Sequence, residues 1–291
     1  MQYPASKLFI VCAAGAFVAC EEPIDLGKEG AARIIINSQL KVGTSVQVDT
    51  RVLNSFGAPA ESPELDQTVG YINGSDGSED TLYVESSNGS VAILVSDDLS
   101  VEEGVTYELT LEAPGFAPLT SVTTVPEAAR FGDQPRGDEA RIPPGDSGAI
   151  SVTLSFGDIV SADNYYYLLV GIAEGAGGRR PSVAGRGMLL TGRNALSSPD
   201  GTWLFDDRGF ADGTFDGRVV FDASALRDIE APVAMIELRT VSRAYYNHLL
   251  TERQRDRSPV RPQGSNASDN VLGGGGVFGS YSVSYLTRSL D

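Results

Sequence analysis

The chain has 291 residues, and its 22 Lys and Arg against 39 Asp and Glu give a formal net charge of −17 at pH 7. Because binding to phosphate backbones depends on clustered positive charge, this balance excludes nucleic acid as an expected partner. The charge is uneven: residues 21–150 hold 7 basic and 23 acidic side chains, whereas residues 151–291 hold 14 and 16. This difference predicts two modules. A saline habitat or a biased genome would explain the acidic surface as well as a cation-binding role of the N-terminal module would.

Residues 1–19 have the features of a secretory signal peptide. Lys7 supplies a positive charge, and residues 8–18 form an apolar run of eleven residues, whereas a membrane-spanning helix needs about 20. The segment 17–20, Phe-Val-Ala-Cys, resembles a bacterial lipobox, in which a cysteine receives fatty-acyl chains such as palmitate before cleavage. We therefore expect cleavage after Ala19 and lipidation of Cys20. An ordinary signal peptide with a chance cysteine is the alternative.

The cysteine content agrees with this interpretation. The only two cysteines are Cys12, inside the segment to be discarded, and Cys20. The mature protein would have no cysteine for a disulfide and would depend on its core, which about 270 residues are enough to build. A lipidated Cys20 with more than one acyl chain would hold it stably on a membrane.

Short strands recur through residues 20–125. Residues 45–52 alternate polar and apolar side chains with a period of two, as a half-buried strand does. Similar patterns occur at 32–37, 68–72, 81–84, 91–95, 106–111 and 121–125. Turn formers such as Asn73-Gly74 and Asn88-Gly89 separate them. This spacing predicts an Ig-like β-sandwich module.

Residues 126–148 are rich in Pro, Gly and Asp and predict a linker or long loop before a second β module at 149–291. Its expected strands are 149–156, 165–173, 217–221, 233–241 and 277–286. Residues 242–254 predict a helix that Ser242 caps and on which Tyr245 and Leu249 share a face. The fold class we expect is all-β, with two β-sandwich-like modules and one short helix near the C-terminal end.

The longest expected loops, 175–187, 199–217 and 258–276, all belong to the second module. Binding residues tend to lie on loops held by a rigid scaffold, so we expect the functional surface there and a spacer role for the first module. Arg179, Arg180 and Arg186 concentrate positive charge in the first loop and predict a partner-binding site. A solvated loop is the alternative.

Carboxylates cluster in the second of these loops, at Asp206, Asp207, Asp212 and Asp216. Calcium prefers such oxygen ligands in glycine-containing loops, so a calcium site is one interpretation. The spacing of an EF-hand is absent, and a solvated acidic loop is the other interpretation. No other cofactor is expected.

Two further patterns have structural as well as functional interpretations. The glycine run 273–276 lacks the Lys-Ser/Thr of a phosphate loop and precedes a strand, which favours close backbone approach or a flexible loop. Tyr165, Tyr166 and Tyr167 would offer a carbohydrate-stacking surface, but with a period of two Tyr166 faces away from its neighbours and at least one face belongs to the core.

Catalysis is not expected. His248 is the only histidine, which excludes the usual zinc sites and any Ser-His-Asp triad that lacks it. Its place on the expected helix favours packing or surface exposure. A hydrolase that uses only carboxylates remains an alternative, because two acids about 5–9 Å apart suffice.

Several segments, in order, resemble a family of Bacteroidota lipoproteins grouped as domain of unknown function 4249. They are the lipidated cysteine with following acids, 104–109, Val125-Pro126, 163–166, the Asp-rich 205–217, 241–246, Ser265-Asn266 and 273–281. The insertion at 175–187 and residues 267–269 depart from the pattern. The family has no established activity, and the resemblance implies outer-membrane proteins that accompany TonB-dependent transporters.

We therefore expect a non-catalytic, envelope-anchored lipoprotein that binds a ligand of unidentified chemistry or docks on such a transporter. A structural or adhesive surface protein, with β modules as spacers, is the alternative. A concave pocket with converging tyrosines or arginines would favour the first.

Overall fold

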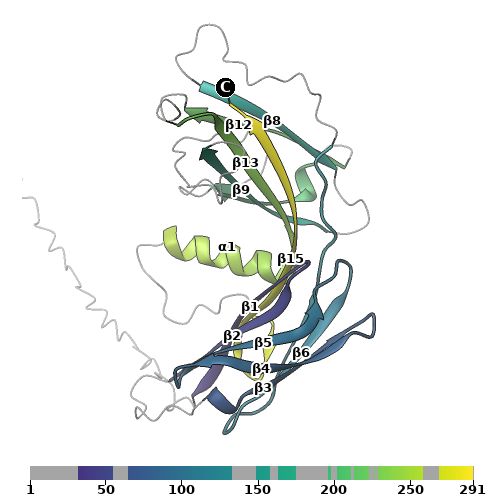
Figure 1. The fold of residues 1–291 in the computed structure, drawn as a ribbon, viewed down its shortest axis with the longest axis vertical. Coiled ribbons are helices and arrows are strands. Elements are labelled where there is room, and N and C mark those ends of the chain that lie inside the picture. The colour runs from purple at the N-terminus through teal and green to yellow at the C-terminus, as the bar shows by residue number, and fades with distance from the viewer. Residues whose placement is uncertain are drawn as a thin grey trace, which may run out of the picture.

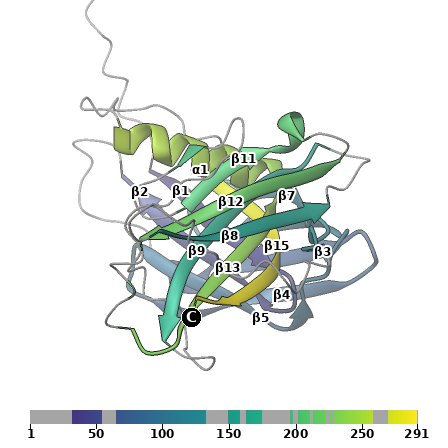
Figure 2. The ribbon, with the colours of Figure 1, turned by 90° about the horizontal axis from the view of Figure 1, so that it is seen from above.

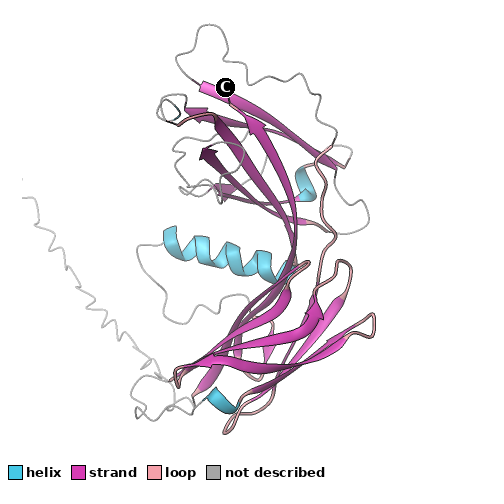
Figure 3. Ribbon diagram, in the orientation of Figure 1, coloured by secondary structure: helices cyan, strands magenta, loops and turns pink. Residues whose placement is uncertain are grey.

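The computed structural model describes residues 32–54, 65–132, 149–157, 163–174, 196–197, 202–210, 213–222, 226, 229–257 and 269–290. These residues are mainly β, with one α-helix, α1 (Arg243–Arg257), and two short 3-10 helices at Leu65–Gln67 and Asp207–Gly209 (Figure 3). The strands are β1 (Arg33–Lys41), β2 (Ser45–Leu53), β3 (Val69–Gly74), β4 (Glu79–Ser87), β5 (Val91–Ser100), β6 (Thr106–Glu112), β7 (Leu119–Thr124), β8 (Ala149–Gly157), β9 (Tyr165–Glu174), β10 (Leu196–Ser197), β11 (Thr202–Asp206), β12 (Thr214–Asp222), β13 (Pro232–Val241), β14 (Val271–Leu272) and β15 (Gly275–Ser289).

Thirteen of these strands are joined by pairing into one curled sheet (Figure 1). Their order is β10-β11-β9-β13-β15-β1-β2-β5-β4-β3-β6-β7-β14, and β12 and β8 form a separate two-stranded sheet. Neighbours are antiparallel except β1 and β15, which run parallel. The first half of the long β15 pairs with β1 and its second half with β13, so this strand joins the two ends of the chain.

Two hydrophobic clusters stabilise the sheet. The first draws side chains from β1, β2 and β5 and from β3, β6 and β7, for example Ile36, Leu94 and Tyr107. The second lies between β9, β11 and β13 and the two-stranded sheet, where the Phe156 ring stacks on Phe215 with centroids 4.7 Å apart. Figure 2 shows β8 and β12 crossing over the strands of the large sheet. Since Phe278 belongs to the first cluster and Leu286 to the second, β15 is part of both.

Hydroxyl groups form hydrogen bonds in the region between the two hydrophobic clusters. Ser280 Oγ donates to the Thr124 carbonyl oxygen at 2.8 Å, and Ser284 Oγ donates to the Ala129 carbonyl oxygen at 2.6 Å. The N–H of Ala129 donates to Thr240 Oγ1 at 3.0 Å. The segment that leaves β7 is therefore tied to β15 and β13 by polar contacts.

The glycine run 273–276, whose last two residues begin β15, meets close backbone neighbours, which is one of the two roles that the sequence predicted. Gly276 has a φ of +102°, and a Cβ atom there would overlap the carbonyl oxygen of Ile36 on β1. A Cβ at Gly274 would lie 2.6 Å from the carbonyl oxygen of Ile34. Only glycine fits here, because the parallel β1 and β15 approach so closely.

The mainly β fold and the C-terminal helix are confirmed, and the expected strands match described strands closely. Ser242 caps α1 as predicted, because its Oγ accepts the Tyr245 N–H at 3.4 Å. The expected loop 199–217 was wrong: it contains the strand β11, all five of whose residues are buried, and the start of β12. Its apolar Trp203-Leu204-Phe205 run belongs to the core, which outweighs the Asp-rich residues that follow.

Of the expected linker 126–148, residues 126–132 are described and the remainder lies outside the described residues. Strand pairing through β15 runs across both expected modules. Within the part of the chain that the structure describes, no helix combines the length and apolar character needed to cross a membrane.

Candidate ligand-binding site on the inner face

The curled sheet has an inner face, which we define as the face that carries α1. Figure 1 shows α1 lying inside the curve, between β9 and β13 on one side and β1 and β2 on the other. Along β1, Ile34, Ile36 and Leu40 point into the first cluster, so the alternate residues Asn37 and Gln39 lie on the inner face, where they are exposed. One side of β1 therefore faces the hydrophobic core, and the other side faces the solvent on the inner face.

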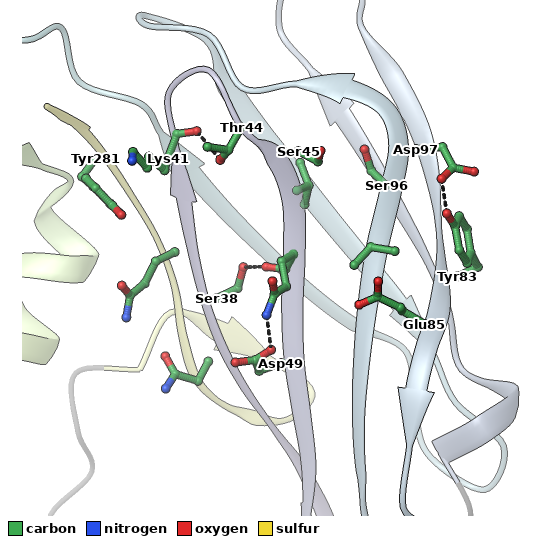
Figure 4. Close-up of a pocket in the computed structure, with 15 residues that line it drawn as sticks. Ser38, Lys41, Thr44, Ser45, Asp49, Tyr83, Glu85, Ser96, Asp97 and Tyr281 are labelled. Atoms are coloured by element: carbon green, nitrogen blue, oxygen red, sulfur yellow. Dashed lines mark hydrogen bonds between the residues drawn. The ribbon is translucent and has the colours of Figure 1, made fainter. Parts of the chain in front are cut away.

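A hollow of about 760 Å³ lies on this inner face (Figure 4). Only Val46 and Val95 among its lining residues are aliphatic, and its volume is within the range of small-molecule sites. The other lining residues are Asn37, Ser38, Gln39, Lys41, Thr44, Ser45, Gln47, Asp49, Tyr83, Glu85, Ser96, Asp97 and Tyr281. They come from β1, β2, β4, β5 and β15 and from the turn between β1 and β2.

Hydrogen bonds hold part of the lining in place. Gln47 Nε2 donates to Asp49 Oδ1 at 3.0 Å, and Ser38 Oγ donates to the Gln47 carbonyl oxygen at 2.6 Å. Within the described residues, the Asn37 amide, the Lys41 ammonium and the Glu85 carboxylate have no hydrogen-bond or ion-pair partner. These three groups are therefore available to a ligand.

Tyr83 and Asp97 form one side of the hollow (Figure 4). The Tyr83 hydroxyl donates a hydrogen bond to Asp97 Oδ1. This hydrogen bond, with the nearby negative charges, raises the pKa of Tyr83 to about 12. The hydrogen bond fixes the phenol, and its ring is 42% exposed.

Tyr281 forms the opposite side and belongs to a cluster of aromatic rings around a half-buried arginine. The guanidinium carbon of Arg239 lies 4.7 Å from the centre of the Tyr281 ring and 5.6 Å from that of Tyr167. Arg239 Nε donates to Glu237 Oε1 at 2.5 Å. Burial alone would lower the pKa of Arg239, but the hydrogen bond and attraction to Glu237 outweigh it and leave the pKa raised. The cation is thus fixed between two rings.

The helix α1 is attached to the edge of the hollow by Tyr245. Its hydroxyl donates to Gln39 Oε1 at 2.8 Å, and burial raises the pKa of Tyr245 to about 12, although the nearby Arg239 opposes the shift. A Cβ at Gly279 would lie only 2.7 Å from the Tyr245 Cβ. The absence of a side chain at Gly279 therefore allows α1 to pack directly on β15.

A second, smaller hollow of about 560 Å³ lies where β7 and the following segment meet the start of α1. Charged and polar side chains among its lining residues include Glu127, Asp163, Tyr165 and Arg243. The two acids and one arginine form no ion pair within the described residues.

The residues predicted to form sites are not brought together on this face. Cys20, Asp212 and the three arginines Arg179, Arg180 and Arg186 lie outside the described residues. Asp206 is buried and paired with Arg208, whose Nε donates to Asp206 Oδ2 at 2.9 Å. Asp207 Oδ2 accepts the Asn164 N–H at 2.7 Å, and Asp216 is exposed on β12. No group of three or more potential metal-binding side chains occurs in the described part.

The three consecutive tyrosines on β9 point to alternate faces of the sheet, as the period of two predicted. Tyr166 is fully buried in the second cluster, whereas Tyr165 and Tyr167 face α1, where Tyr165 and Tyr246 have ring centres 4.7 Å apart. His248 lies half-buried on α1, and burial lowers its pKa. Its Nδ1 is buried and has no hydrogen-bond partner among the described residues.

Sequence reasoning missed the hollow, whose lining comes mostly from strands within 20–125. The period-two pattern of 45–52 correctly identified Gln47 and Asp49 as one polar face. It gave no sign that β15, from the far end of the chain, completes that face with Tyr281.

The described residues thus define a mainly β protein with a polar hollow on the inner face of a curled sheet. The chain belongs to the family described as domain of unknown function DUF4249, whose model matches residues 21–287. No curated protein matches the sequence. Among solved structures, the chain is similar to the crystal structure of a DUF4785 family protein from Legionella pneumophila, with 12% sequence identity and a TM-score of 0.27. That comparison covers 71% of this chain and 52% of the other, so the chain spans about half the length of that protein.

Proposed function

We propose that this protein is a non-catalytic lipoprotein, anchored in the outer membrane, that binds a ligand with its inner face as an accessory of a TonB-dependent transporter. The observation that carries the binding role is the polar hollow, in which the polar groups of Asn37, Lys41 and Glu85 are unpaired within the described residues. Polar groups that line one concave site are typical of ligand recognition, whereas a surface that serves only as a spacer needs no concave site.

The anchoring part of the proposal is supported by residues 1–20. The apolar run, Ala19 and Cys20 have the order of a lipoprotein signal, and the family match begins at residue 21. Changing Cys20 to serine should release the protein from membranes into the soluble fraction. Continued membrane attachment of Cys20→Ser would overturn this part.

Recovery of a partner tests the accessory role. The chain would be purified from native membranes in detergent, and a stoichiometric outer-membrane transporter is expected in the eluate. A variant with Asn37→Ala and Glu85→Gln would show whether the hollow takes part in docking. Recovery of the chain alone would favour the structural or adhesive alternative.

A carboxylate hydrolase is the weaker alternative, and it would use carboxylates of the hollow, whose lining includes Asp49, Glu85 and Asp97. Turnover of a bound ligand that Glu85→Gln abolishes without loss of binding would establish this alternative.

We also propose that the chain is divided into two β-sandwich-like modules, residues 20–125 and 149–291, which residues 126–148 separate. The two hydrophobic clusters support it, since the first is built largely from strands before residue 126 and the second largely from strands after residue 148.

A further inference from the structure

We infer that the hollow on the inner face binds a short, neutral oligosaccharide. This inference rests on the proposed ligand-binding function and adds the chemical class of the ligand. Sugar hydroxyls both donate and accept hydrogen bonds, so their partners need groups of both kinds within one site. The hollow offers this mixture in the Asn37 amide, the Lys41 ammonium and the Glu85 carboxylate.

The orientation of Gln39 adds a directed donor. Its Oε1 accepts the hydrogen bond from Tyr245, which leaves the Nε2 hydrogens for a ligand. Asp49 Oδ1 similarly accepts from Gln47, so its second oxygen remains an acceptor. Both side chains are therefore held in position before a ligand arrives, which reduces the conformational entropy lost on binding.

Two tyrosine rings on opposite sides of the hollow suit the apolar faces of sugar rings. Tyr83 is held by its hydrogen bond to Asp97 (Figure 4), and the guanidinium of Arg239 lies against the Tyr281 ring and holds it. A ring that is fixed and partly exposed offers contact area at little entropic cost.

The same lining disfavours two other ligand classes, polyanions and apolar molecules. A polyanion would meet three carboxylates, Asp49, Glu85 and Asp97, against the single ammonium of Lys41. An apolar ligand would leave the polar groups of the hollow without partners, which costs free energy.

An extended peptide is less well suited than a sugar to the part of the floor around Asn37 and Asp49. Asn37 on β1 is paired with Val277 and with Asp49, and Asp49 on β2 is also paired with Ile93, so the backbone at both positions already takes part in the sheet. A peptide that binds a sheet usually pairs its backbone with a free strand edge, and these two positions offer none. Their side chains must supply the hydrogen bonds, and this arrangement suits hydroxyl groups.

Calorimetric titration of the full chain tests this inference. The protein is purified from membranes in lauryldimethylamine oxide, because a detergent with a sugar head group would compete. The neutral probes are maltotriose, cellotriose, laminaritriose and triacetylchitotriose, and the comparison probes are trigalacturonate, trilysine and trialanine. We expect at least one neutral trisaccharide to bind, and to bind more tightly than every comparison probe.

Variants then locate the site. Asn37→Ala and Glu85→Gln should each weaken trisaccharide binding roughly three- to tenfold. The first removes about one hydrogen bond, and the second replaces a charged acceptor oxygen by an amide donor. The matched controls are Asn73→Ala on β3 and Glu112→Gln on β6, two exposed residues outside the hollow, which should leave the affinity unchanged.

Three results would overturn the inference: no binding of any neutral probe, binding that Asn37→Ala and Glu85→Gln do not weaken, or tighter binding of trilysine or trialanine. If the transporter is still recovered in any of these cases, the ligand class is wrong and the accessory role stands. Loss of both the trisaccharide and the transporter would refute both.

Discussion

Gly276→Ala should be among the most destabilising single substitutions in the described sheet. Residue 276 has a φ of +102°, where a residue with a side chain costs about 1–3 kcal/mol. The added Cβ would also overlap the Ile36 carbonyl oxygen, so β15 must move away from β1. Loss of one or two ladder hydrogen bonds adds about 1 kcal/mol each. We expect the free energy of unfolding to fall by about 2–5 kcal/mol, a large part of the 5–15 kcal/mol typical of domains.

Urea unfolding measures this effect. The single tryptophan, Trp203, is 2% exposed and reports by fluorescence on the second cluster, while far-ultraviolet circular dichroism reports on the whole sheet. Gly89→Ala is the matched control, because Gly89 has a φ of +78° but open space around its Cα. It should cost only about 1–2 kcal/mol. An equal loss for the two variants would refute the reasoning from close strand approach.

The same experiment tests the division into modules. Gly276 lies beside the first hydrophobic cluster, whereas Trp203 lies in the second. Two separated transitions in Gly276→Ala, with the fluorescence change at the higher urea concentration, would support two modules. Coincident transitions would mean that β15 couples the clusters into one cooperative unit.

Three further predictions concern α1 and the second cluster. Tyr245→Phe should cost about 1 kcal/mol for the lost hydrogen bond to Gln39. The substitution should also reduce the loss of stability between pH 10 and 12. The raised pKa of Tyr245 contributes stability that is complete below pH 10, the ordinary pKa of tyrosine, and that disappears as pH rises through about 12. Urea titrations at pH 10 and pH 12 measure the difference. His248→Gln should flatten the decline of stability as pH falls below 6.5. A lowered histidine pKa gives stability that is present above pH 6.5 and is lost on acidification. An unchanged slope of the free energy of unfolding against pH between pH 7 and 5 would contradict this prediction. Phe156→Ala should cost about 3–5 kcal/mol in thermal unfolding, because Phe156 contacts several other rings, and a loss below 1 kcal/mol would show that the two-stranded sheet is held by other contacts.

The regular elements were predictable because their signals are local. Alternation with a period of two reflects the two faces of a strand, and it located β2 and separated Tyr166 from Tyr165 and Tyr167. The cap at Ser242 followed from residue type and position alone. β11 was missed because its five residues are all buried, so they form a short apolar run without alternation beside an acidic stretch.

The site was less predictable because its parts are distant in sequence. Polar positions such as Gln47 and Asp49 mark a face that is not core, but any solvent-exposed sheet face would look the same. The prediction of a functional surface on the long loops of 151–291 rested on the general tendency of loops to carry binding residues. A hollow on a sheet face depends on the curvature of the sheet and on which distant strands lie side by side, and neither leaves a local pattern.

The inner face depends on contacts of very long range. Gln39 and Tyr245 are separated by 206 residues, yet their hydrogen bond joins β1 to α1 at the edge of the hollow. That contact requires β15 to lie beside β1, which the glycines at 276 and 279 permit. Because nothing in β1 alone specifies this neighbour, the hollow exists only once both ends of the chain have paired. Binding should therefore be lost together with the β1–β15 pairing, even where the hairpins within the first cluster remain folded.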